Sequence, residues 1–310
     1  MMIPLNPVWR MGLIILAVLV ISSVAVALLC RLKPQKNFSE LVARLKAWWI
    51  MAAVFFGAIG VSDRISLVFF AFLSFWALKE YITLLKTRPA DHRALVWTFL
   101  AVPIQYLWIG IHWYGMFIIF IPVYMFLFLP VRLVLARDTT GFVASASQIQ
   151  WGLMAFVFGL SHLAMLLTFP HANGSAANGR TLLLFLVFVV EMSDVLQYVW
   201  GKSIGRHKIL PTVSPNKTWE GFLGGIITTS LSSLLLRFLT PFTPLETVGA
   251  TLLLTVAGFF GGAVMSAVKR DFGVKDFGGL IPGHGGMLDR VDSLCYAAPV
   301  FFHYLRYFYY

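Results

Sequence analysis

The segment from Ser266 to Asp292 gathers charged residues and glycines in a chain that is otherwise strongly apolar. Asp289 and Asp292 are three positions apart, so they share a face if a helix begins there, and Asp276 reaches them across a glycine-rich turn. Three carboxylates without cysteine ligands suit a hard cation such as Mg²⁺, which binds through one or two carboxylates together with substrate phosphates. The segment therefore predicts metal-assisted phosphate chemistry.

Basic side chains in the same segment supply the positive charge that phosphates need, and its glycines let the backbone approach a ligand closely. The sequence contains no nucleophilic Ser or Cys dyad in this segment and no GxxxxGK[ST] phosphate loop, so we expect transfer from a nucleotide to a second substrate that brings the nucleophile. The alternative is a solvated loop in which His284 is a hydrogen-bonded turn residue. The candidate catalytic residues are Lys269, Arg270, Lys275, His284 and Arg290.

Another polar segment lies before it in the chain, at residues 201–225; we call residues 201–225 the first polar segment and Ser266–Asp292 the second. Ser214 and Pro215 predict a helix start, with the Ser hydroxyl as cap and Pro in the first turn, and Thr218 offers a second start. A helix amino terminus beside Lys217 suits a phosphate, although a capped return into the membrane would explain Ser214 and Pro215 alone. The candidate substrate-binding residues are Ser214, Asn216, Lys217 and Thr218.

Two acidic residues, Glu191 and Asp194, lie three positions apart inside an apolar run. Ionisable groups at membrane depth cost about 2.5–3.5 kcal/mol each on insertion scales, so they face a partner or a polar cavity. For Glu191, a structural pair with a basic residue explains the position as well as a functional role does. A functional role is favoured for Asp194 because polar sequence follows it so closely.

The composition predicts the elements that position these groups. With 59% hydrophobic and 12% charged residues, 310 residues cannot form a soluble domain, so we expect an all-α polytopic integral membrane protein. Nine to ten transmembrane helices are expected, because the second and last apolar runs are short. The runs lie near residues 9–30, 48–61, 65–85, 94–110, 114–135, 151–169, 181–200, 220–239, 248–268 and 294–308.

The distribution of Lys and Arg predicts the orientation of these helices. When ten spans are threaded, 19 of the 24 basic residues fall on one side, which the positive-inside rule makes cytoplasmic and which carries both polar segments. The net charge of +11 then reflects topology and attraction to anionic membrane lipids, and nucleic acid is not expected as a partner. We divide the chain into N-terminal transmembrane helices at 1–180 and a catalytic transmembrane region at 181–310.

Glycines spaced by four residues occur on two of the expected helices, as Gly221 with Gly225 and as Gly258 with Gly262. In membranes such small faces allow close helix packing. We expect them to bring the helix after the first polar segment against the helix before the second.

The second polar segment resembles the signature of the phosphatidate cytidylyltransferase (CDP-diacylglycerol synthase) family. The resemblance is carried by Ser266, Lys269, Arg270, Lys275, Asp276, the run Pro282-Gly283-His284-Gly285-Gly286, Asp289, Arg290 and Asp292. The stretches from Asp194 to Gly201 and from Ser214 to Gly221 are also similar to family segments, in the expected order. The specific resemblance covers about the last third of the chain.

The resemblance implies a Mg²⁺-dependent enzyme in which the phosphate of phosphatidate (phosphatidic acid) attacks the α-phosphorus of CTP. It implies Asp276, Asp289 and Asp292 as metal ligands with Asp194 as a fourth, a monovalent cation such as K⁺ beside Mg²⁺, and phosphate contacts from the basic residues named above. A homodimer is in keeping with the family, although the same glycines would serve packing within one chain. A bacterial inner membrane with a cytoplasmic active site is the expected location.

One residue departs from the family pattern: Gln197 stands where members commonly carry Ala. It suggests a divergent branch with a different lipid acceptor or a changed pocket. Two other functions compete with the resemblance: a CTP-dependent lipid alcohol kinase, which transfers the γ-phosphate, and a transporter with an ion site at mid-membrane. The complete signature argues against the first, and the placement of both polar segments on one side argues against the second.

Overall fold

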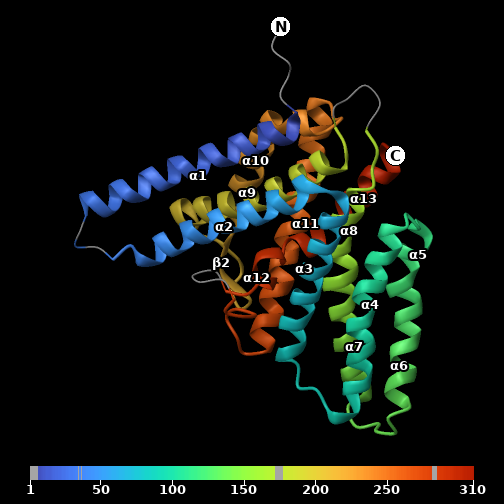
Figure 1. Cartoon of the computed structure of the whole chain (residues 1–310). Coiled ribbons are helices and arrows are strands. Elements are labelled where there is room, and N and C mark those ends of the chain that lie inside the picture. The colour runs from blue at the N-terminus through green and yellow to red at the C-terminus, as the bar shows by residue number, and fades with distance from the viewer. Residues whose placement is uncertain (1–5, 34, 36, 172–176, 281–284) are drawn as a thin grey trace.

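A computed structural model of the chain describes residues 6–33, 35, 37–171, 177–280 and 285–310, and most of them are helical (Figure 1). The expected all-α fold class is confirmed, with one small hairpin added. The first half contains α1 (Pro7–Leu32), α2 (Ser39–Val61), α3 (Asp63–Leu84), η1 (Pro89–Asp91), α4 (His92–Gly110), α5 (Tyr114–Ile119), η2 (Phe120–Met125), α6 (Phe126–Val134), α7 (Phe142–Gly152), η3 (Leu153–Gly159) and α8 (Leu160–Leu166). The second half contains α9 (Gly179–Ile204), β1 (Lys208–Leu210), β2 (Ser214–Thr218), α10 (Trp219–Ser233), η4 (Leu234–Leu239), α11 (Pro244–Asp271), α12 (Leu288–Val291) and α13 (Leu294–Phe308).

Eight helical stretches in the described part of the chain are long and apolar enough to cross a membrane. Three of them are composite: a wider π-helical turn interrupts the spans Tyr114–Val134 and Phe142–Leu166, and the span Trp219–Leu239 ends in the tighter 3-10 helix η4. Pro122 lies in the first of these turns, and a proline inside a helix removes one backbone donor and clashes with the carbonyl four residues before it. The eight apolar spans make this protein an integral membrane protein.

Two of the ten expected spans, α4 and α13, are helices but are not among these eight. α13 has 15 residues, fewer than the about 20 that a helix needs to cross the hydrocarbon layer. The second span begins earlier than expected, since α2 already starts at Ser39 rather than near residue 48. A helix satisfies its own backbone, so it can run on through the basic residues of this stretch, whose long side chains reach toward water.

The predicted threading requires α3 and α9 to begin on the same side of the membrane. A salt bridge of 2.8 Å between Arg180 and Asp63 joins the first turns of these two helices, in agreement with that threading. Residues 180 and 63 are 117 positions apart, so the pair joins α9 to α3 across a long stretch of the chain.

The core of the protein surrounds α13, which contacts α8, α9 and α11. Its Phe301 and Phe302 are fully buried. α1 and α2 form a hairpin that projects from this bundle (Figure 1), and most apolar side chains of α1 are exposed. In a membrane these side chains face lipid, which solvates them as well as a protein core would.

The first polar segment folds differently from the prediction. Ser214 and Pro215 do not start a helix; they belong to β2, which pairs antiparallel with β1. Proline is tolerated because a two-stranded sheet has only edge strands. The second predicted start is correct: α10 begins after Thr218, whose Oγ1 accepts a hydrogen bond of 3.1 Å from the Gly221 N–H.

The helices α10 and α11 contact each other as expected, but their glycines make their closest approaches to other elements. Gly221 and Gly225 on α10 lie against α9, where a Cβ atom at Gly225 would come within 3.0 Å of the Gln197 Cα. On α11, Gly258 faces Val190 of α9, and Gly262 lies next to Lys217 and Ser293. Close packing therefore joins α9 to α10 and brings α11 against the candidate site.

Candidate active site

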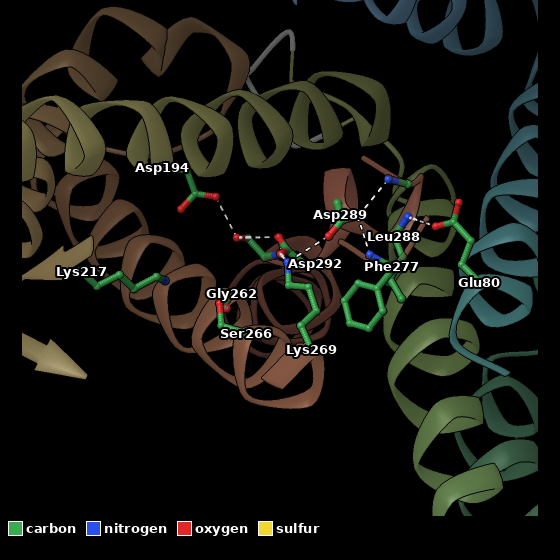
Figure 2. A network of polar contacts seen from close by, with 12 residues as sticks. Glu80, Asp194, Lys217, Gly262, Ser266, Lys269, Phe277, Leu288, Asp289 and Asp292 are labelled. Carbon is green, nitrogen blue, oxygen red and sulfur yellow. Dashed lines mark hydrogen bonds and ion pairs between the residues drawn. The ribbon is translucent and has the colours of Figure 1, made fainter. Parts of the chain in front are cut away.

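Lys269 in the last turn of α11 lies between two of the predicted carboxylates (Figure 2). Its Nζ donates a hydrogen bond of 2.9 Å to Oδ1 of Asp289 and lies 3.9 Å from Oδ2 of Asp292. The Asp289 side chain is only 3% exposed, so this ion pair is shielded from water. The two acids, which are three residues apart, therefore both lie near the ammonium group of Lys269.

Asp289 also holds the glycine-rich segment that precedes it. Its Oδ2 accepts hydrogen bonds of 2.9 Å from the N–H groups of Phe277 and Gly286. Gly285 has a φ of 78°, and a Cβ atom there would lie 2.8 Å from the same Oδ2 and 3.2 Å from the Cβ of Asp276. Asp276 and Asp289 therefore flank one turn that requires glycine.

A second carboxylate pair forms around the hydroxyl of Ser293. This hydroxyl donates a hydrogen bond of 2.8 Å to Oδ2 of Asp194 and lies 3.4 Å from Oδ1 of Asp292. The Ser293 N–H donates a hydrogen bond of 2.7 Å to the same Oδ1 of Asp292. Asp194 from the middle of α9 and Asp292 from the turn before α13 are thus brought to one place, as Figure 2 shows.

These two acids line a cavity of about 260 Å³ that the β1–β2 hairpin borders. The cavity brings together the carboxylates, the Ser293 hydroxyl, and the predicted substrate-binding residues Ser214, Asn216, Lys217 and Thr218. The two polar segments, which the sequence separates by about one helical hairpin, therefore meet at a single site.

Lys217 supplies positive charge to this cavity. Its Nζ donates a hydrogen bond of 3.0 Å to the carbonyl of Phe259 and lies 4.3 Å from the centre of the Phe259 ring. Burial lowers the pKa of Lys217 below its ordinary value, while Asp194 and Asp292 partly offset this effect. Among the described residues no carboxylate pairs directly with Lys217, so its charge is available to a ligand.

The carboxylates fit a divalent cation in chemistry, although no group of three His, Cys, Asp or Glu side chains in the described parts of the chain lies close enough to hold a metal by itself. Mg²⁺ needs only one or two carboxylates when substrate phosphates complete its shell. Burial raises the pKa of Asp292, and Lys269 offsets this only in part. A cation beside Asp194 and Asp292 would therefore stabilise their ionised forms.

The structure describes all but one of the remaining predicted residues. Arg270, Lys275 and Asp276 are exposed, and the Arg270 Nε donates a hydrogen bond of 3.4 Å to the Val213 carbonyl next to β2. The Nε of Arg290 is buried without a hydrogen-bond partner among the described residues. His284 lies outside the described residues.

Two residues of the site cannot be identified from the two polar segments alone. Ser293 joins Asp194 to Asp292, and Glu80 on α3 accepts hydrogen bonds from the N–H groups of Met287 and Leu288. The sequence gives one signal for Glu80: it is an acidic residue inside an apolar run, and such residues usually face a partner. In the fold Glu80 is buried.

Gln197 borders the cavity one helical turn after Ser193, to whose hydroxyl its Nε2 donates a hydrogen bond of 2.7 Å. Its side chain packs against Gly225 of α10. The one departure from the family pattern therefore lies in the wall of the candidate site and not on a distant surface.

Comparison with known families gives a match to the model of the cytidylyltransferase family over residues 42–308. The match includes every described residue of the site, from Glu80 to Ser293.

Individual relatives agree with this match. The chain is 45% identical over 275 residues to the uncharacterized protein YnbB of Escherichia coli strain K12, covering 88% of this chain and 90% of that protein. It is 40% identical over 126 residues to the phosphatidate cytidylyltransferase of Staphylococcus aureus strain COL, covering 40% of this chain and 48% of that enzyme. It is 37% identical over 134 residues to the phosphatidate cytidylyltransferase of Staphylococcus haemolyticus, covering 43% of this chain and 52% of that enzyme. The matches to these two enzymes therefore span about half of their length.

Proposed function

The chain belongs to the cytidylyltransferase family, and from that premise we propose that it transfers the cytidylyl group of CTP to phosphatidate, giving CDP-diacylglycerol and pyrophosphate. The relatives named phosphatidate cytidylyltransferase support phosphatidate as the acceptor. The more extensive match, to YnbB, carries no activity in its name, so the acceptor is the part of the proposal that needs a direct test.

The observation that carries the proposal is the cavity in which the carboxylates of Asp194 and Asp292 face the ammonium group of Lys217. A site for nucleotidyl transfer needs cations against the phosphates and carboxylates that can hold a metal. Both kinds of group line this cavity, and the Ser293 hydroxyl fixes the two acids.

In this proposal Asp194 and Asp292 hold Mg²⁺, with Asp289 and Asp276, which flank Gly285, as further candidates. The metal, when bound, neutralises charge on the phosphates and polarises the phosphorus that is attacked. Lys217 binds phosphate oxygens, and Ser214 and Asn216 of β2 border the same space.

The chemistry requires no nucleophile from the protein. A phosphate oxygen of the lipid forms a bond to the α-phosphorus of CTP, and the bond from that phosphorus to the oxygen bridging to the β-phosphorus breaks, so that pyrophosphate leaves. The attacking oxygen is already ionised at neutral pH, so the residues of the chain position the two substrates and balance their charge.

We place the site on the cytoplasmic side of a bacterial inner membrane, where CTP is present. The bias of basic residues supports this orientation. The Arg180–Asp63 pair on the opposite ends of the helices is compatible with it.

The proposal is tested by incubating the purified protein with CTP, Mg²⁺ and one lipid acceptor at a time, with phosphatidate, a polyprenol and diacylglycerol in parallel. We expect a CDP-lipid by mass spectrometry, with release of pyrophosphate, only with phosphatidate. A phosphorylated polyprenol or diacylglycerol would contradict the proposal and identify a CTP-dependent lipid kinase.

A further inference from the structure

Glu80 reaches from α3 into the segment that carries Asp289 (Figure 2). Its carboxylate is buried, with 7% of the residue exposed, and it accepts three hydrogen bonds. The donors are the Trp76 indole N–H at 3.2 Å, the Met287 N–H at 3.0 Å and the Leu288 N–H at 2.8 Å. Two of the three come from backbone more than 200 positions away in the sequence.

Glu80 and Asp289 together hold both described sides of the glycine-rich segment. Asp289 takes the N–H groups of Phe277 and Gly286, and Glu80 takes the next two N–H groups, those of Met287 and Leu288. The backbone lies directly on the Glu80 carboxylate, because a Cβ atom at Gly278 would come within 2.8 Å of Oε1, and one at Gly286 would collide with Oε2. Glycine residues therefore allow this segment to pass close to the two carboxylates.

The contact ends one residue before Asp289. A shift of Leu288 would move Asp289 away from Lys269, whose Nζ lies 2.9 Å from its Oδ1. Among the described residues no basic side chain forms an ion pair with Glu80, so this buried carboxylate is held by N–H donors alone. A buried charge is costly unless such bonds satisfy it, and their loss would leave both the acid and the backbone groups unpaired.

We propose that Glu80 is a positioning residue for the cytidylyl transfer: by fixing Met287 and Leu288 it sets the Asp289 carboxylate against Lys269. This inference rests on the proposed function and adds a residue from the N-terminal helices to its machinery. Glu80 borders the segment rather than the cavity around Lys217, so it acts through Asp289 and not through contact with CTP.

The test compares Glu80→Gln and Glu80→Ala with the wild-type protein, and uses Glu246→Gln as a matched control. Glu246 also accepts a backbone N–H, that of Thr243, but it lies at the opposite end of α11 from Lys269. We measure hydrogen exchange of the backbone amides of residues 286–288, the turnover number, and the Mg²⁺ concentration that gives half-maximal activity.

We expect Glu80→Gln to exchange faster at residues 286–288, to lose roughly 10- to 100-fold in turnover, and to need several-fold more Mg²⁺, while the control changes none of these. A general loss of stability would reduce the amount of active protein without changing the Mg²⁺ requirement. Unchanged Mg²⁺ requirement and turnover in Glu80→Gln would overturn the proposal, and so would unchanged exchange.

Glu80→Gln keeps the size of the side chain and one acceptor oxygen, so it tests the proposed role of Glu80 even if Glu80→Ala does not fold. Hydrogen exchange at residues 286–288 can be measured whether or not the protein catalyses the proposed reaction. Failure of the proposed reaction would appear as a wild-type protein that makes no CDP-lipid, whereas failure of the Glu80 contact would appear as unchanged exchange in the variants.

Discussion

The hydroxyl of Ser293 donates a hydrogen bond of 2.8 Å to Oδ2 of Asp194, and so joins the turn before α13 to the middle of α9. Asp292, the neighbour of Ser293, thereby faces Asp194 across the candidate cavity. Neither acid has a basic residue within hydrogen-bond distance among the described residues, since Lys269 is 3.9 Å from Asp292. The Ser293 hydroxyl thus holds the carboxylates of Asp194 and Asp292 close together, where they can bind a cation.

Replacing Ser293 by Ala should lower turnover by roughly 10- to 100-fold, because the hydroxyl orients two carboxylates that we propose bind metal. Asp292→Asn should lower turnover further, since it removes a charge from the site itself. Steady-state assays over a range of Mg²⁺ concentrations check both variants. A Ser293→Ala enzyme with normal turnover at low Mg²⁺ would show that the hydroxyl has no such role.

Asp289→Asn should abolish turnover, and the structure adds a loss of stability that its sequence motif does not predict. The carboxylate accepts from two backbone N–H groups and from Lys269, and an Asn amide cannot satisfy all three. Turnover is measured together with the thermal unfolding midpoint in detergent. Retention of most activity would remove Asp289 from the active site.

Lys217→Ala should weaken CTP binding by about 10- to 100-fold, the range for one hydrogen bond from a charged donor. Lys208 offers a matched control, because it is an exposed Lys on the same hairpin and does not border the cavity. Michaelis constants for CTP are compared between the two variants. Equal effects of both substitutions would mean that only the overall charge of the hairpin matters.

The pH dependence of CTP binding should reflect the lowered pKa of Lys217. Below that pKa the side chain is charged and holds phosphate; as the pH rises through it, the charge is lost and affinity falls. The fall should therefore begin at a lower pH than an ordinary Lys would give, and Lys217→Arg should shift it upward because arginine stays protonated. Michaelis constants for CTP between about pH 7 and pH 10 measure this, and identical profiles for the two proteins would assign the titration to another group.

Gly225→Ala should destabilise the protein by about 1–3 kcal/mol, because the new methyl group would collide with Gln197 where α10 packs on α9. Gly249→Ala in α11 is the control, since a Cβ atom there meets no other atom within 4 Å. It should be neutral or slightly stabilising, as alanine favours helix more than glycine does. Thermal unfolding of both variants in the same detergent gives the comparison.

The membrane fold and the convergence of acids could be predicted because both follow from local pattern. Runs of apolar residues predict most of the spans, and the spacing of Asp289 and Asp292 predicts that they share a face, although it does not predict that Lys269 joins them. The apolar run does not predict where α2 begins, because the helix starts before that run and contains basic residues there. The sequence does not distinguish a helix start from a strand at Ser214 and Pro215, because a capped helix and an edge strand tolerate the same residues and only the pairing with β1 decides between them.

Contacts between distant segments could not be predicted. Nothing near Glu80 in the sequence indicates that it binds Met287 and Leu288, since the partners lie on another part of the chain and are backbone groups. The role of Ser293 is hidden for the same reason, because an isolated Ser after Asp292 is unremarkable until α9 brings Asp194 beside it. The glycines of α10 predicted close packing but could not identify α9 as the partner.

The central claim, cytidylyl transfer at the cavity between Asp194, Asp292 and Lys217, is tested most directly with CTP labelled at either the α- or the γ-phosphate. Purified protein, Mg²⁺ and phosphatidate are incubated with each, and label in the lipid phase is counted, with Asp292→Asn as the inactive control. The account predicts lipid labelled only from the α position, and none with the variant. Lipid labelled only from the γ position would contradict it, because the protein would then transfer phosphate rather than the cytidylyl group.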